Sequence, residues 1–328
     1  MAGFSVSEAL GAGFRLIGRK PLTVPMWGVA YFLIAVLPVM LILAAAAPSV
    51  IELVRQAMAG AEEPDPYAML NLTGPLILLH PVMFLSSIAA RAIVMNAVFR
   101  AVLEPQDDRV FYLRLGAVEL WQALVQLCLM VLVGLAIMLA VLGALVVGGV
   151  VAMAVMSAGV REFQPWMAGG GVLIALLIGA VILWLFLRLS MAGPMTFAAR
   201  NFRLFESWTL TRGQAGRLFL LALLIMLILF AIELAVSLVI GLIVAAVVAT
   251  AAVSLDQAQI MAFLEQPGAW LPVLIPLCLF VAAIACLVGG YVFAIVLAPW
   301  AEAYRQLSGP ADAATAPAAP DPGLAQEA

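Results

Sequence analysis

Long apolar runs alternate with short polar segments along most of this chain. A transmembrane helix needs about 20 predominantly apolar residues, and six of the runs are long enough. We expect spans at residues 22–47, 76–103, 120–155, 169–199, 217–253 and 271–302, joined on the outside by acidic or polar segments at 48–75, 157–165 and 254–270. The pattern predicts an all-α, polytopic integral membrane protein whose six-span membrane domain covers residues 1–306.

The two ends of the chain need separate interpretations. The first apolar run follows basic residues and precedes a run of alanines, as in a secretory signal. Its 26 residues exceed the roughly 7–15 of a cleavable signal core, so an uncleaved first span is the favoured interpretation. Residues 307–328 are rich in Ala and Pro and poor in large apolar side chains, which predicts a disordered cytoplasmic tail.

Composition excludes several classes of protein. The chain is 66% hydrophobic and only 10% charged, which leaves too little polar surface for a water-soluble fold. The net charge is −3 and the basic residues are scattered, so we expect no nucleic-acid partner. The three cysteines lie in apolar runs and suggest neither a disulfide framework nor a metal site. We expect no cofactor, no metal and no catalytic residues.

The basic residues predict the orientation. Segments placed inside hold thirteen of the fifteen Lys and Arg residues, whereas only Arg55 and Arg161 lie outside. By the positive-inside rule, the N- and C-termini are then cytoplasmic.

Three short segments of mixed polarity occur beside the inner ends of the spans. They begin near Phe4, Arg109 and Phe202, and they are too short to cross a bilayer, so we expect three interfacial amphipathic helices. Span-ending arginines recur at Arg100, Arg200 and Arg305. This spacing favours a threefold internal repeat, although any alternating topology also places arginines at inner ends.

The stretch from Trp184 to Leu220 carries the best-marked of these segments. Its basic and aromatic residues suit a helix lying among anionic headgroups with its rings at acyl depth. The candidate lipid or interface residues are Arg200, Arg203, Phe205, Trp208, Arg212 and Arg217. Ordinary anchoring of the protein at the interface is the alternative. Thr211 and Gln214 have capping-box spacing, which suggests that they start the next helix.

Few polar residues fall inside the predicted spans. Glu233 is the candidate intramembrane polar site, either as a proton-coupling or substrate-contacting group or as a structural carboxyl. His80 stands alone and is interpreted as an interfacial polar residue. Gly171, Ala175 and Gly179 form a small-residue stripe that predicts a helix-packing face.

The stretch from Trp184 to Leu220 forms a predicted hairpin between the fourth and fifth spans. Two motifs in this hairpin carry a family resemblance. The pattern Arg188-Leu189-Ser190-x-Ala192-x-Pro194 is followed by Glu206-Ser207-Trp208-x-Leu210-Thr211-Arg212-Gly213. Together they resemble the membrane domain attached to some bacterial glycerophosphoryl diester phosphodiesterases, and the stretch AVFRAVLEPQDDRVFYLRLGAVEL is similar to stand-alone alphaproteobacterial members. The chain departs from that family in having one histidine and no soluble catalytic domain. The resemblance therefore implies a membrane scaffold without an enzyme, located in a bacterial inner (cytoplasmic) membrane.

These observations lead to two functional hypotheses. The first is a non-enzymatic inner-membrane protein that interacts with membrane lipids, with anionic lipids as the candidate class, or scaffolds a membrane or envelope protein partner. The alternative is a transporter or permease subunit for a small or lipid-like substrate, working through Glu233.

Overall fold

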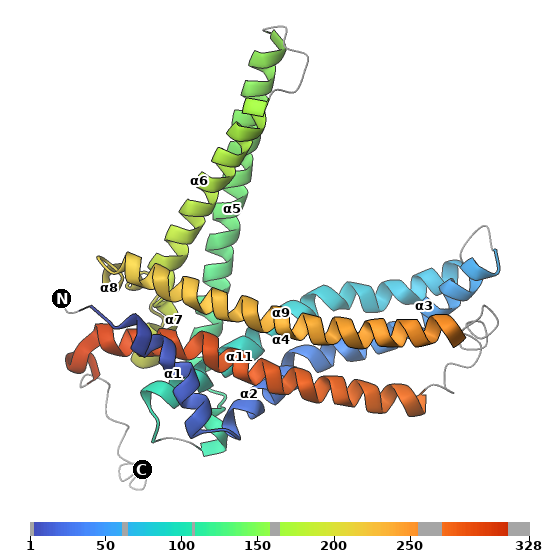
Figure 1. Cartoon of the computed structure of the whole chain (residues 1–328), viewed down its shortest axis with the longest axis horizontal. Helices are drawn as coiled ribbons and strands as arrows, with labels where there is room; N and C mark the ends of the chain where they lie inside the picture. Colours follow the sequence, from blue (N-terminus) through green and yellow to red (C-terminus); the bar gives the residue numbers. More distant parts are fainter. Residues whose placement is uncertain (1–2, 61–64, 107–108, 158–164, 255–270, 314–328) are drawn as a thin grey trace, which may run out of the picture. The chain divides into compact units, whose positions relative to one another are not determined.

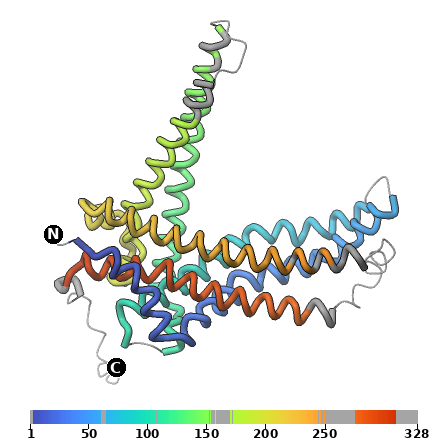
Figure 2. The backbone as a smooth tube through the Cα atoms, in the orientation of Figure 1, coloured from blue at the N-terminus to red at the C-terminus, as the bar shows by residue number. Residues whose placement is uncertain are grey.

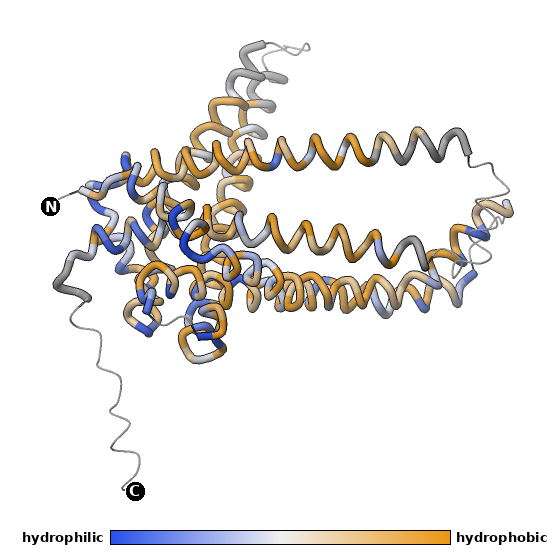
Figure 3. The backbone as a smooth tube through the Cα atoms, turned by 60° about the horizontal axis from the view of Figure 1, so that its bottom comes forward, coloured by the Kyte–Doolittle hydropathy of each residue, from blue (hydrophilic) through white to orange (hydrophobic). Residues whose placement is uncertain are grey.

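The computed structural model describes residues 3–60, 65–106, 109–157, 165–254 and 271–313. These residues form helices joined by short turns, with no strand among them. Six of the helical segments are long and apolar enough to cross a membrane, which confirms the all-α, multi-pass class. Figure 1 labels the helices, and Figure 3 shows that the long ones are hydrophobic over most of their length. The predicted loop at 254–270 lies almost entirely outside the described residues, as do 158–164 and the end of the tail from 314.

The helices have the following bounds. In chain order they are α1 (Val6–Arg19), α2 (Thr23–Tyr31), the π-helix η1 (Phe32–Val36), α3 (Leu37–Met58), α4 (Pro66–Leu103), the 3₁₀ turn η2 (Arg109–Tyr112), α5 (Ala117–Ser157), α6 (Pro165–Leu189), α7 (Ala192–Ala199), α8 (Ser207–Leu210), α9 (Ala215–Ser254) and α11 (Leu271–Ala313).

The connection between the first two spans is much shorter than the predicted 48–75. α3 continues to Met58 with Pro48 inside it, and α4 begins at Pro66. Asp65 caps α4, because its Oδ1 accepts a hydrogen bond of 3.0 Å from the Tyr67 N–H. Proline at the first position of a helix gives up no hydrogen bond, so Asp65-Pro66 is a helix start that the loop prediction overlooked.

The first span contains a π-helical turn with a clear cause. The Leu37 N–H reaches back five residues to the carbonyl of Phe32. The next residue, Pro38, has no N–H to donate, and its ring would collide with the carbonyl four residues earlier. The effect of Pro38 is therefore one widened turn within a continuous helical run.

Two compact units are distinguished within the chain. Unit 1 comprises Met1–Val6, Gly116–Leu220 and Ala303–Ala328, and unit 2 comprises Ser7–Leu115 and Leu221–Glu302. In unit 1, α5 and α6 run side by side, and in unit 2, α3 pairs with α4 (Figure 2). Each unit is described separately below.

The core of unit 2 gathers residues from α1, α2, α4, η2 and α11. Its buried members include Leu16, Trp27, Val98, Tyr112 and Ala298. In contrast, most large apolar side chains of α3 and of the first half of α4 are exposed, as expected where lipid surrounds a helix. The tightly packed part of unit 2 therefore lies near the ends of these helices that we predict to be cytoplasmic.

Glycines bring α2 and α11 into backbone contact within this core. A Cβ added to Gly28 would overlap the carbonyl oxygen of Cys286, and one added to Gly290 would overlap that of Val24. Gly13 of α1 approaches the backbone of Ala294 in the same way. Small residues permit such close helix packing in membranes. The prediction for the Gly171 stripe is not supported at Gly179, where an added Cβ would meet nothing within 4 Å.

The three interfacial segments differ in structure. The first is the 14-residue helix α1, whose buried residues are Ala9, Ala12, Gly13 and Leu16. The second is only the turn η2, and the third contains only the four-residue helix α8. The threefold repeat stays a prediction.

The span-ending arginines also differ in their surroundings. Arg100 is buried and donates to the carbonyl of Tyr112. Arg200 ends α7 in the left-handed conformation, with φ 51°. Arg305 lies inside α11, which was expected to end at 302 and instead continues past a kink at Gly309. The predicted tail therefore begins with helical residues.

Candidate functional site

The end of the fourth span is broken just after Leu189. A single helix was expected to run to residue 199, but α6 ends at Leu189 and the short helix α7 begins at Ala192. Pro194 lies in the first turn of α7, where a missing N–H is tolerated. In a continuous helix its ring would collide with the carbonyl of Ser190, which favours a break at this point.

Within unit 1, specific contacts hold the segment after α7 in place. Thr196 Oγ1 donates to the carbonyl of Arg203 at 3.1 Å and accepts from its N–H at 3.2 Å. Leu204 is buried in a cluster with Val125, Leu189 and Ala192. These contacts tie a loop to the protein, so residues 202–206 do not form the amphipathic helix that was expected.

Ser207 and Thr211 bind the open end of α6. Ser207 Oγ donates a hydrogen bond of 2.8 Å to the carbonyl of Arg188 and accepts one of 3.2 Å from the Met191 N–H. Thr211 Oγ1 lies 3.3 Å from the same carbonyl and 2.9 Å from the carbonyl of Ser207. A helix end leaves carbonyls unpaired, and these two buried hydroxyls satisfy one of them. Thr211 lies in the turn before α9, in agreement with the expected turn chemistry, but α9 begins only at Ala215, so Thr211 does not start the next helix.

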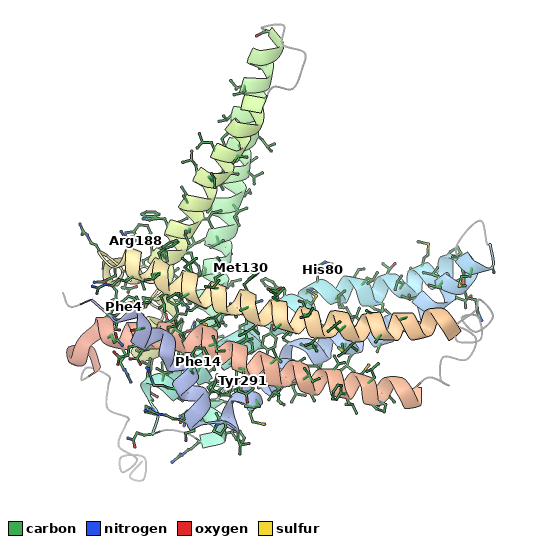
Figure 4. All side chains as sticks on the ribbon, in the orientation of Figure 1. Phe4, Phe14, His80, Met130, Arg188 and Tyr291 are labelled. Carbon is green, nitrogen blue, oxygen red and sulfur yellow. The ribbon has the colours of Figure 1, made fainter. Side chains whose placement is uncertain are left out.

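The side chain of Arg188 lies against two tryptophans. The centre of its guanidinium is 5.8 Å from the Trp184 ring and 5.5 Å from the Trp208 ring, both within cation–π range. The two rings are 4.9 Å apart and nearly perpendicular, an edge-to-face arrangement. Figure 4 labels Arg188 at the α7 end of α6. We call Trp184, Arg188, Ser207, Trp208 and Thr211 the Arg188 cluster.

The guanidinium of Arg188 has unused hydrogen-bonding capacity. Its Nε and Nη1 are buried and have no hydrogen-bond partner among the described residues. The residue as a whole is only half-buried. Leaving a buried donor unpaired costs about 1–3 kcal/mol, more for a charged group. The arrangement therefore presents a partly desolvated cation, two of whose three nitrogens lack an acceptor among the described residues.

The predicted interface residues do not form one apolar stripe. Phe205 is 66% exposed, whereas Trp208 packs in the Arg188 cluster. The basic residues of the predicted set are exposed; these are Arg200, Arg203, Arg212 and Arg217. Trp208 is thus the one predicted residue that joins the cluster. Sequence analysis missed Arg188 and Trp184 as site residues, although their spacing of four places both on one helix face.

The remaining polar candidates lie elsewhere. Glu233 is an exposed residue of α9, without a hydrogen-bond or ion-pair partner among the described residues. His80 is exposed on α4. In the part of the chain that the structure describes, no group of three or more His, Cys, Asp or Glu residues comes together as metal ligands would.

Comparisons of the chain with protein-family models, with curated proteins and with solved structures give no match. The class defined by the fold is therefore a six-span, all-α membrane protein. Any narrower assignment rests on the Arg188 cluster itself.

Proposed function

We propose that this chain is a non-enzymatic, lipid-binding protein of a bacterial inner membrane, and that Arg188 binds the phosphate of an anionic phospholipid in the cytoplasmic leaflet. The observation that carries the proposal is the unpaired guanidinium of Arg188, held between Trp184 and Trp208. A phosphate offers several acceptor oxygens in a geometry that matches the planar fork of arginine.

The position of Arg188 along α6 supports a headgroup as the ligand. Arg188 lies 23 residues after Pro165, or about 35 Å along a helix, slightly more than the roughly 30 Å of a bilayer core. If α6 enters at the outer surface, as the distribution of basic residues predicts, Arg188 reaches the level of the inner headgroups. Tryptophans are typical of that level.

The surrounding surface suits an acidic leaflet. Arg203, Arg212 and Arg217 are exposed on the same stretch of chain, and Phe205 exposes an apolar ring beside them. Basic residues near a membrane surface each contribute about 1 kcal/mol of attraction to anionic lipids. We therefore assign a general attraction to these residues and the specific contact to Arg188.

The family resemblance is compatible with this proposal. A membrane domain similar to that of the glycerophosphoryl diester phosphodiesterases would act as a lipid-handling scaffold, for itself or for an envelope protein partner. The transporter alternative has less support, because Glu233 is exposed on α9 rather than placed in a described cavity.

Native mass spectrometry tests the proposal. The full-length protein is purified in a mild detergent, and the bound phospholipids are identified and counted. Arg188→Gln should carry one anionic phospholipid fewer than wild type, because glutamine keeps polarity but has no charge. Arg212→Gln, which alters an exposed arginine of the same hairpin, should carry as many as wild type. Equal lipid counts in Arg188→Gln and wild type would contradict the proposal.

A further inference from the structure

A groove of about 780 Å³ lies in unit 2 between the first two spans. Its volume is in the range of known small-molecule sites, about 300–1,000 Å³. One wall is formed by Ala35, Val36 and Val39, and the facing wall by Met83, Phe84 and Ser87 of α4. We call this the α3–α4 groove.

The π-helical turn forms part of one wall. Ala35 and Val36 belong to η1, which exists because Pro38 interrupts the normal hydrogen-bond ladder. On the facing helix, Ser86 Oγ lies 3.5 Å from the carbonyl of Ala35. The groove is therefore bounded by the irregular part of the first span, and π-helical turns of this kind are frequent at functional sites.

The two ends of the groove differ in chemistry. Tyr31 and Arg91 lie at one end, and His80 and Pro81 lie at the other. Arg91 and His80 are eleven positions apart on α4, which corresponds to about 16 Å. Figure 4 labels His80 part of the way along α4. A positive charge thus marks one end of a largely apolar groove.

The sequence places the charged end at the inner boundary of the membrane. Glu52, the first acidic residue after Tyr31, follows it by 21 positions, or about 31 Å of helix. On α4, the polar residue Asn71 precedes Arg91 by 20 positions, or about 30 Å of helix. Both distances match a bilayer core of about 30 Å. With Arg91 at the inner boundary, the groove extends about 16 Å and so spans the cytoplasmic leaflet.

Arg91 is available to a ligand. Its side chain is exposed, and it has no hydrogen-bond or ion-pair partner among the described residues. The other arginine nearby on α4, Arg100, is buried and already donates to the carbonyl of Tyr112. Among the described residues that line the groove, Arg91 is the one arginine, and its guanidinium is free to bind a ligand.

We propose that the α3–α4 groove binds one phospholipid of the cytoplasmic leaflet, with its phosphate on Arg91 and one acyl chain along the walls as far as His80. The positive charge at the inner boundary matches the phosphate, and the apolar walls, about one leaflet long, match the chain. None of the residues involved belongs to the Arg188 cluster, so this second lipid site is separate from the proposed function.

The test uses the full-length protein in nanodiscs of mixed zwitterionic and anionic phospholipid, transferred to a mild detergent for native mass spectrometry. Wild type should retain two phospholipids. Arg91→Ala should retain one, and Arg91→Ala combined with Arg188→Gln should retain none. Val39→Phe, which fills the groove while leaving Arg91 intact, should also retain one. Leu41→Phe, at an exposed position of α3 outside the groove, is the matched control and should retain two.

The outcomes separate the two proposals. If Arg91→Ala and Val39→Phe both keep the wild-type count while Arg188→Gln loses a lipid, the groove proposal is overturned and the proposed function stands. If Arg91→Ala loses a lipid and Arg188→Gln does not, the groove proposal stands and the proposed function is overturned. A loss in Leu41→Phe equal to that in Val39→Phe would also overturn the groove proposal, because it would show a nonspecific effect of the added ring.

Discussion

Ser207 donates a hydrogen bond of 2.8 Å to the backbone carbonyl of Arg188, 19 residues earlier in the chain. This contact gives a structural reason for the second sequence motif, ESWTLTRG at residues 206–213. Ser207 and Thr211 bind the carbonyl of Arg188, and Trp208 packs on its guanidinium. Anchoring at a membrane surface would not require these residue types at this spacing, whereas holding one arginine in place does.

Replacing Ser207 should destabilise the hairpin. Ser207→Ala leaves the buried Met191 N–H without its acceptor and removes one donor from the Arg188 carbonyl, for an expected loss of about 1–3 kcal/mol in the free energy of unfolding. Thr209→Ala is the control, because the exposed Thr209 hydroxyl bonds only the nearby carbonyl of Glu206. Denaturant unfolding of the purified protein measures both. Equal stability of the two variants would refute this role for Ser207.

Replacing Trp208 should weaken both the fold and lipid retention. Trp208→Ala removes a cation–π contact and an edge-to-face contact, each worth about 0.5–1.5 kcal/mol. Phe205→Ala, at a ring that is 66% exposed, should change stability by about 0.5 kcal/mol or less. Thermal unfolding and bound-lipid analysis of the two variants provide the comparison. A larger effect at Phe205 than at Trp208 would favour simple membrane anchoring.

The neighbouring glycines 289 and 290 offer a matched test of the packing of α2 on α11. Gly290→Ala places a methyl group against the backbone of Val24, which cannot move aside as a flexible side chain could. Overpacking of this kind typically costs about 1–3 kcal/mol, so the variant should unfold at lower denaturant concentration than wild type. Gly289→Ala should be tolerated, because an added Cβ there meets nothing within 4 Å. Similar unfolding midpoints for both variants would show that these helices do not pack closely.

The turn η2 should become more stable when Val110 is replaced by glycine. Val110 has φ 50°, a left-handed conformation that is unfavourable for a β-branched residue, and its side chain is 73% exposed. Val110→Gly should therefore gain about 1 kcal/mol. Leu115→Gly is the control: Leu115 is even more exposed, at 83%, but has no positive φ, so this change should give no gain. Destabilisation by Val110→Gly, measured as a lower unfolding midpoint, would contradict the claim that the backbone at Val110 is strained.

The spans were predictable because length and apolar composition decide whether a helix can cross a bilayer. All six predicted runs correspond to helices of that kind. The π-helical turn before Pro38 has an equally local cause, since Pro38 has no N–H to donate.

The site was harder to predict because its contacts are not local. Thr211 resembled a capping residue of the following helix, yet its hydroxyl lies 3.3 Å from a carbonyl 23 residues earlier. The interfacial helix expected from Phe202 onward is reduced to the four residues of α8, because Thr196 and Leu204 hold the preceding residues as a loop. Gly28 and Gly290 are far apart in the chain, and only the fold reveals their close approach.

The most direct test of the central claim is the lipid preference of Arg188. Equilibrium binding of labelled anionic and zwitterionic phospholipids to the delipidated protein would be compared in wild type, Arg188→Gln and the control Arg212→Gln. We predict that Arg188→Gln weakens anionic-lipid binding about tenfold, or about 1.4 kcal/mol, and that Arg212→Gln changes it far less. Unchanged anionic-lipid affinity in Arg188→Gln would contradict the account.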